Sequence, residues 1–166
     1  KKFGVKISYV EESKRLGTAG ALSLIEEPIS DPFFVINADV LTRLDFTDFL
    51  GAHLRGGNTA SMCVKQHTYQ VPFGVVNSND SQEITNIEEK PTYCFDVNAG
   101  VYVLNPEVIY KVPDNEFFDM PSLFDRLIND GYKASVYRID DYWIDIGRKE
   151  DLQKAHFDMT GFSGNA

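Results

Sequence analysis

The sequence predicts an α/β fold with a mixed sheet flanked by helices, and two features of the chain support this prediction. A continuous apolar run from Phe33 to Ile36 is typical of a strand covered on both faces, as in a parallel sheet. Residues 73–104 then contain three strand-like segments separated by polar turns, with no helical pattern between them. A parallel start followed by a β-rich middle indicates a mixed sheet with an antiparallel excursion.

Strands and helices alternate in the first part of the chain. Residues 5–9 alternate apolar with polar side chains, which predicts a strand with one buried face. A short helix is expected over residues 19–25, after a glycine-rich turn. Asp45 is the expected N-cap of a helix that runs to about Leu54 and ends at two glycines. Residues 59–66 then read as another buried strand.

The last third of the chain predicts a helix, two strands and a closing helix. Pro121 opens the first helix, which carries apolar residues at helical spacing. Residues 133–139 and 141–147 read as strands, and the closing helix is expected from Lys149 to about Phe157. At 166 residues the chain is long enough for one domain. We therefore assign residues 1–158 to a single domain and 159–166 to a frayed tail.

Composition excludes several classes of partner. A net charge of -9 at pH 7 repels nucleic acid and anionic lipid, although a few placed cations or a metal can still hold a small phosphorylated ligand. No apolar run approaches the ~20 residues that span a bilayer. Cys63 and Cys94 lack the spacing of a zinc site and are expected to be buried thiols in a reducing compartment. We therefore expect a cytoplasmic protein without nucleic-acid or membrane partners.

Two aspartates are the first functional signal. Asp39 and Asp145 each follow apolar strand residues, so both are expected at strand tips, where open α/β sheets bind ligands. Carboxylates brought together repel each other unless a cation lies between them, and Mg²⁺ is the usual ion when a substrate supplies phosphate oxygens. The alternative is that each aspartate only caps the helix or turn that follows it.

Several weaker signals lie in the β-rich middle. Lys90 can neutralise a phosphate, and Glu89 can accept hydrogen bonds from sugar hydroxyls, although a segment of this kind taken alone is usually a solvated turn. Gly100 either lets a ligand approach the backbone or marks a bulge, and Gly74 is a weak signal alone. The single tryptophan, Trp143, is expected in the core.

Seven motifs, in order and with matching spacing, resemble the sugar-1-phosphate nucleotidyltransferase family, and most of all its mannose-1-phosphate guanylyltransferase branch. The resemblance runs from about Val5 to Ala155. The motifs are LGTAGAL, VINADVL, PFGVV, IEEKP, VNAGVYVLNPE, DMPSLFDRLI and WIDIGRKEDLQKA. The resemblance implies a Rossmann-like mixed sheet.

The resemblance also implies roles for single residues. The nucleotide would be bound by Leu16, Gly17, Thr18, Ala19, Gly20, Asn37 and Ala38. The sugar would be bound by Gly74, Glu89, Asn98 and Gly100. Asp39 and Asp145 would be the catalytic Mg²⁺ ligands, and Lys90 the catalytic lysine that holds the sugar phosphate. In this interpretation the two glycines of GTAG leave room for the base.

The implied reaction transfers a nucleoside monophosphate from a nucleoside triphosphate, with GTP favoured, to a sugar-1-phosphate and releases pyrophosphate. The glycine-rich triphosphate loop that opens this family is missing from the 166 residues. We therefore expect the C-terminal portion of a catalytic domain, without its first βα unit and inactive alone. The exposed sheet edge that results is expected to pair either with another copy, giving a homo-oligomer, or with an upstream segment.

Two other classes share part of this pattern. A silent relative could bind nucleotide sugar and regulate a partner, but two metal-binding carboxylates and Lys90 argue against it. A phosphorylated receiver or phosphatase-like domain could use Asp39 as nucleophile, but the β-rich middle and the lack of a second acid beside Asp39 argue against that. Neither the base nor the sugar is fixed by the sequence.

Overall fold

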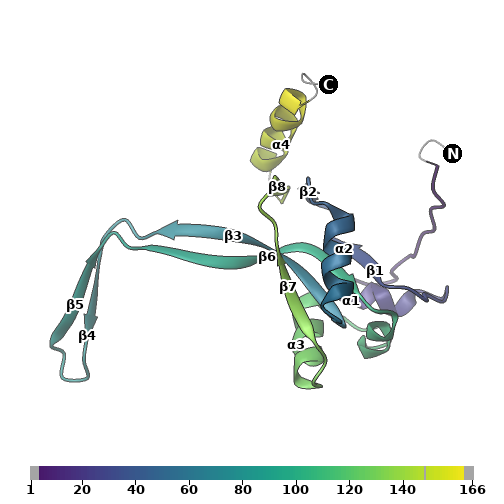
Figure 1. The fold of residues 1–166 in the computed structure, drawn as a ribbon, viewed down its shortest axis with the longest axis horizontal. Coiled ribbons are helices and arrows are strands. Elements are labelled where there is room, and N and C mark those ends of the chain that lie inside the picture. Colours follow the sequence, from purple (N-terminus) through teal and green to yellow (C-terminus); the bar gives the residue numbers. More distant parts are fainter. Residues whose placement is uncertain (1–3, 148, 163–166) are drawn as a thin grey trace.

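A four-stranded mixed sheet forms the centre of the protein in the computed structural model, which describes residues 4–147 and 149–162 (Figure 1). The order of its strands is β1 (Phe33–Ile36), β6 (Thr92–Leu104), β3 (Ala60–Gln70) and β7 (Ala134–Arg138). Strand β6 runs antiparallel to both β1 and β3, whereas β3 and β7 are parallel. The mixed sheet expected from the sequence is confirmed.

Helices cover both faces of this sheet because side chains of β6 alternate between two apolar clusters. Tyr102 and Leu104 face one cluster, and Val101 and Val103 face the other. The first cluster is closed by α1 (Gly17–Gly20), the 3₁₀ helices η1 (Ala21–Leu24) and η2 (Pro106–Lys111), and α3 (Met120–Asn129). The second is closed by α2 (Phe46–Arg55). In the part of the chain that the structure describes, no helix combines the length and apolarity needed to cross a bilayer.

A second, two-stranded sheet lies against the cluster under α2. It pairs β2 (Val40–Thr42) antiparallel with β8 (Trp143–Asp145), and α4 (Lys149–Phe162) follows. The Trp143 indole N–H donates to the Ala99 carbonyl at 2.8 Å, and the ring packs against this cluster, as expected for a core tryptophan. The sequence analysis missed β2, which is only three residues long.

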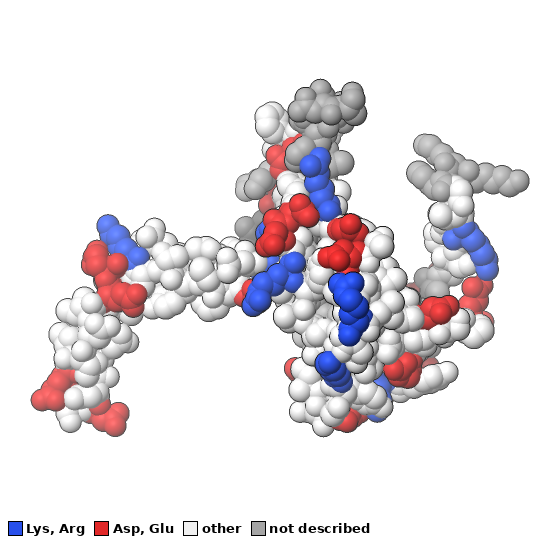
Figure 2. Space-filling model, viewed as in Figure 1, with Lys and Arg blue, Asp and Glu red and all other residues white. Residues whose placement is uncertain are grey.

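Beyond the core, β3 and β6 continue as a two-stranded ribbon, which ends in the hairpin of β4 (Gly74–Ser78) and β5 (Ile84–Glu89) (Figure 1). These are the antiparallel strands expected over residues 73–104. Strand β3 runs to Gln70, past the expected end at residue 66, because its ladder with β6 continues to Thr92. Figure 2 shows charged side chains where ribbon and hairpin meet and near the hairpin's end, with uncharged surface between.

Four expectations are corrected by the structure. Residues 5–9 form no strand and are exposed, because no strand among the described residues lies beside them. The helix expected over 19–25 begins earlier, at Gly17, and ends as the 3₁₀ helix η1. Cys94 is exposed because it lies on the ribbon, whereas Cys63 is buried as expected. Helix α4 runs past residue 157 to Phe162, and residues 163–166 of the expected frayed tail lie outside the described residues.

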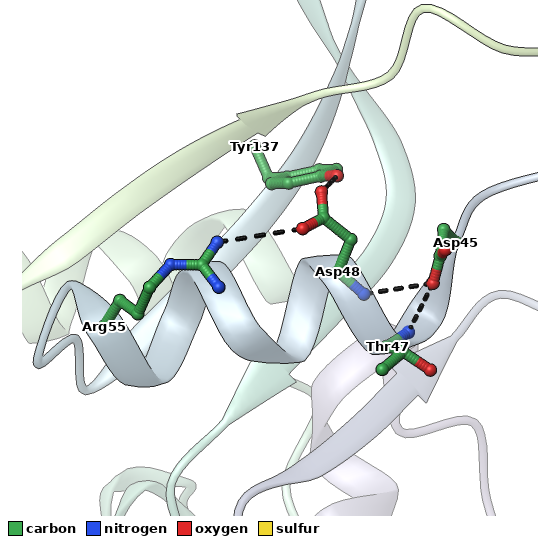
Figure 3. A network of polar contacts seen from close by, with 5 residues as sticks. All are labelled: Asp45, Thr47, Asp48, Arg55 and Tyr137. Atoms are coloured by element: carbon green, nitrogen blue, oxygen red, sulfur yellow. Dashed lines mark hydrogen bonds and ion pairs between the residues drawn. The ribbon is translucent and has the colours of Figure 1, made fainter.

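Helix α2 is fixed at its start by the expected cap and is tied to β7 (Figure 3). The Asp45 carboxylate accepts hydrogen bonds from the backbone N–H groups of Thr47 and Asp48, at 2.9 and 3.0 Å. Asp48 in turn accepts a 2.6 Å hydrogen bond from the Tyr137 hydroxyl and lies 3.7 Å from Arg55. The Asp48 bond, followed by burial, raises the pKa of Tyr137 to about 12. The network therefore joins helix and sheet while Tyr137 is protonated.

We predict that this network contributes stability that is lost in strong base. A tyrosine pKa raised by folding stabilises the folded state fully below the unfolded value near 10, and this stability disappears as the pH rises through about 12. Asp48→Ala should return the Tyr137 pKa toward about 10. The measurement is an NMR titration of ring-labelled tyrosine, with Asp114→Ala as the control that leaves the value high. An unchanged Tyr137 pKa in Asp48→Ala would contradict the assigned cause.

Candidate functional site

The structure brings Asp39 and Asp145 together, although more than a hundred residues separate them in the sequence. Val40 and Asp145 are paired residues of β2 and β8, and the Ile146 N–H donates to the Asp39 carbonyl oxygen at 2.8 Å. Both aspartates are exposed. Two carboxylates therefore lie on adjacent backbone segments at one end of the small sheet.

The chemistry of this pair fits a hard divalent cation. Among the described residues, neither carboxylate accepts a hydrogen bond or forms an ion pair, so the oxygens of both are open to a cation. No group of three or more His, Cys, Asp or Glu side chains suited to a metal occurs in the described part of the chain. A cation at Asp39 and Asp145 would therefore complete its shell with water and substrate oxygens, as Mg²⁺ commonly does.

Gly100 lies in a bulge of β6 next to this pair. The ladder passes from Met62 opposite Tyr102 to Val64 opposite Asn98, so β6 carries extra residues at this point. Gly100 has a φ of +70°, and a Cβ there would lie 2.8 Å from the side-chain nitrogen Nδ2 of Asn37. Its carbonyl accepts a 2.8 Å bond from the Asn37 N–H. The bulge expected as one role of this glycine is therefore observed, and a ligand's approach to its backbone stays a prediction.

Asn98, an exposed residue of β6, stabilises the same bulge through its side chain. Its side-chain amide donates to the Tyr102 hydroxyl at 2.8 Å, and its carbonyl oxygen accepts from the Gly100 N–H at 2.9 Å. Burial raises the pKa of Tyr102, and the bond from Asn98 partly offsets that rise. The side chain of Asn98 therefore links the Gly100 backbone, which bonds Asn37, to the buried Tyr102 hydroxyl.

The segment Leu16–Gly20 lies on the other face of the large sheet. Ala19 packs in the cluster with α3, whereas Val40 and Trp143 pack in the cluster under α2. The residues predicted to bind the nucleotide therefore fall into two places, with Asn37 and Ala38 beside the aspartates and Leu16–Gly20 across the sheet.

Hydrogen bonds hold this segment to the start of α3. The N–H groups of Ala19 and Gly20 both donate to the Phe118 carbonyl at 2.9 Å. The Thr18 N–H donates to the Asp119 carboxylate at 3.0 Å, and the Thr18 hydroxyl accepts from the Met120 N–H at 2.9 Å. Thr18 therefore caps α3 from a different part of the chain.

Close packing against residues 116–119 explains why both glycines of GTAG lack a side chain. Gly17 has a φ of +78°, and a Cβ on it would lie 2.6 Å from Asp119 Oδ1. A Cβ on Gly20 would lie 2.5 Å from the Glu116 carbonyl oxygen. Bare backbone is therefore needed for the close approach of residues 116–119, and space for a base remains a prediction.

Gly74, Glu89 and Lys90 are placed at the base of the hairpin, away from β2 and β8 (Figure 1). Gly74 is paired with Glu89, and a Cβ on Gly74 would meet the Glu89 carboxylate at 3.0 Å. Lys90 is exposed and has a φ of +49°, an uncommon conformation for a residue with a side chain. The structure keeps these three residues together but does not bring them to the aspartates.

The role of Trp143 was missed by sequence reasoning, which placed it only in the core. Trp143 lies two residues before Asp145, and its bond to the Ala99 carbonyl fixes β8 against the β6 bulge. The available signal was a single tryptophan on the same short strand as a candidate metal ligand.

Comparisons with known proteins give one family. The model described as "Nucleotidyl transferase" matches residues 1–161. The catalytic subunit beta of mannose-1-phosphate guanylyltransferase from Dictyostelium discoideum is 31% identical over 92% of this chain and 44% of its own length. A UTP–glucose-1-phosphate uridylyltransferase from Synechocystis is 32% identical over 93% of this chain and 45% of its own. The chain thus spans less than half the length of these relatives.

Solved structures agree with this match. HddC from Yersinia pseudotuberculosis, in a crystal structure complexed with GMP-PN, superposes with a TM-score of 0.64 at 25% identity. The superposition covers 93% of this chain and 67% of HddC.

We predict opposite effects for two glycine-to-alanine changes. Gly20→Ala should destabilise the fold by about 1–3 kcal/mol, because the new methyl group meets backbone that cannot move freely. Gly51→Ala, within α2, should stabilise it by about 0.5–1 kcal/mol, since its only close neighbour is the flexible end of Arg55. Urea unfolding of both variants measures the difference. Equal stabilities would show that residues 116–119 do not require the glycine.

Proposed function

Because the chain belongs to the nucleotidyl transferase family, we propose that it is the catalytic part of a sugar-1-phosphate nucleotidyltransferase. The reaction is transfer of a nucleoside monophosphate from a nucleoside triphosphate, with GTP favoured, to a sugar-1-phosphate. The adjacency of Asp39 and Asp145 on β2 and β8 is the observation that carries the proposal. The guanylyltransferase and uridylyltransferase names of the relatives support the reaction class.

In this reaction an oxygen of the sugar phosphate attacks the α-phosphorus of the triphosphate, and pyrophosphate leaves as its bond to that phosphorus breaks. Asp39 and Asp145 would hold Mg²⁺, which when bound neutralises phosphate charge. Lys90 places its ammonium against the phosphate of the sugar, and Glu89 accepts hydrogen bonds from sugar hydroxyls. The work of the protein is alignment and charge compensation, with no covalent intermediate.

The nucleotide is assigned to Leu16–Gly20 together with Asn37 and Ala38. Thr18 and Ala38 are exposed and open to a ligand, whereas Ala19 and Gly20 are buried against their own chain. Gly74, Asn98 and Gly100 complete the proposed sugar side. Base contacts are therefore expected from the exposed members of the segment.

The proposal requires the hairpin to approach the aspartates when both substrates bind. Lys90 lies at the far end of the ribbon, and the ribbon leaves the core at the β6 bulge beside Gly100 (Figure 1). Bulges bend the strand that carries them, so this junction is where a change in ribbon direction is expected. The 166 residues also lack the family's glycine-rich triphosphate loop, so we expect turnover to need a longer protein.

Replacing either aspartate tests the proposal directly. In the full-length protein, Asp39→Asn and Asp145→Asn should each lower turnover ~100-fold or more, because each removes charge from the metal site. Asp31→Asn, an exposed aspartate before β1, is the matched control and should keep parental turnover. Pyrophosphate release is the measurement. Activity within a few-fold of the parent in either site variant removes that residue from the proposed machinery.

Lys90→Ala should separate the two substrates kinetically. The KM for sugar-1-phosphate should rise at least ~10-fold, while the KM for the triphosphate stays near the parental value, because the ammonium meets one phosphate only. Alanine tolerates the positive φ about as poorly as lysine, so the backbone strain is matched. Equal rises in both KM values would assign Lys90 a structural role.

A further inference from the structure

Lys65 on β3 donates all three of its ammonium hydrogens to one short stretch of backbone. Its Nζ lies 3.1 Å from the carbonyl oxygen of Ile139, 3.0 Å from that of Asp140 and 2.9 Å from that of Asp141. An ammonium has three donors, so these three bonds use them all. The side chain is half-buried, which holds it in this position.

These carbonyls lie where the chain leaves the large sheet. The parallel ladder of β3 and β7 ends with Val64 opposite Arg138, and the last backbone bond runs from the Ile139 N–H to the Val64 carbonyl at 2.9 Å. Backbone carbonyls beyond the end of a ladder need another donor. Lys65 is that donor for three consecutive residues, through bonds strengthened by its charge.

The stretch held by Lys65 leads directly into β8, which carries Asp145. Within β8 itself, the bond of Trp143 to the Ala99 carbonyl is a second polar link to the large sheet. We propose that Lys65 is a positioning residue that fixes β8, and with it Asp145, relative to the large sheet. The catalytic purpose of this placement rests on the function proposed above, but the placement itself does not.

A direct role for Lys65 in binding phosphate is a different interpretation of the same lysine. A phosphate-binding ammonium must offer a free donor, whereas the three donors of Lys65 are already taken by carbonyl oxygens. The geometry therefore favours positioning over ligand contact.

The single tryptophan makes the placement measurable. In the full-length protein, with any tryptophan outside these residues replaced by phenylalanine, emission reports on β8 alone. Lys65→Met roughly keeps the length of the side chain but removes its hydrogen-bond donors. This variant should shift Trp143 emission to the red and raise acrylamide quenching about twofold. Lys65→Arg should restore both values, since it keeps a charged donor.

Lys133→Met is the matched control. The Lys133 ammonium also donates to a backbone carbonyl, that of Gly56, but at the opposite end of the β3–β7 pair. Its emission and quenching should equal those of the parent. If Lys65→Met does not fold by circular dichroism, Lys65→Gln, which keeps a neutral donor, should show the same changes at smaller size. Parental emission and quenching in the folded Lys65 variant overturn the proposal.

Kinetics separate this proposal from the proposed function. Lys65→Met should raise the Mg²⁺ concentration for half-maximal pyrophosphate release ~10-fold or more, as loss of groups that orient metal ligands does, with the KM for sugar-1-phosphate unchanged. An unchanged Mg²⁺ requirement, with Asp145→Asn impaired, overturns the positioning of Asp145 and leaves the function intact. If Asp145→Asn retains full activity, the proposed function fails, and Trp143 fluorescence alone then decides whether Lys65 fixes β8.

Discussion

The bulge of β6 at Ala99 and Gly100 is the constraint on which the candidate site depends. The Gly100 carbonyl accepts the bond from Asn37, which precedes Asp39, and the Ala99 carbonyl accepts the bond from Trp143, which precedes Asp145. Two consecutive residues of one central strand thus hold both acid-bearing segments. The Asn37 bond continues the β1–β6 register by one residue, whereas the Ala99 carbonyl lies where the bulge interrupts the β3–β6 ladder and is therefore open to Trp143.

The same strand divides the molecule into a core and an exposed ribbon. From Ala99 to Leu104 every residue of β6 is buried, whereas residues 92–96 are exposed. The ribbon and hairpin carry large apolar side chains in solvent, namely Tyr69, Phe73, Val76, Ile84, Ile87 and Phe95. Each strand there pairs with one neighbour only, and the side chains have little to pack against, so packing stabilises the ribbon less than the core. Glu89 and Lys90 lie on this less supported part.

Polar side chains, rather than apolar packing alone, fix the small sheet and the start of α3. Lys65 holds the exit of β7 through three carbonyls, and Thr18 caps α3 from a distant segment. Both act on backbone groups that regular structure leaves without partners. Loss of either side chain would leave the elements intact and change where they lie.

The sequence by itself determined the type of most elements, the Asp45 cap of α2, and the order of motifs that identifies the family. Those features depend on local periodicity, capping chemistry and motif spacing, which can be read from residues close together in the sequence. Only the tertiary structure decided why Gly17 and Gly20 are bare, that residues 5–9 are not a strand, and that Lys90 lies apart from the aspartates. Each of these depends on which distant segment lies alongside, and local pattern does not contain that information.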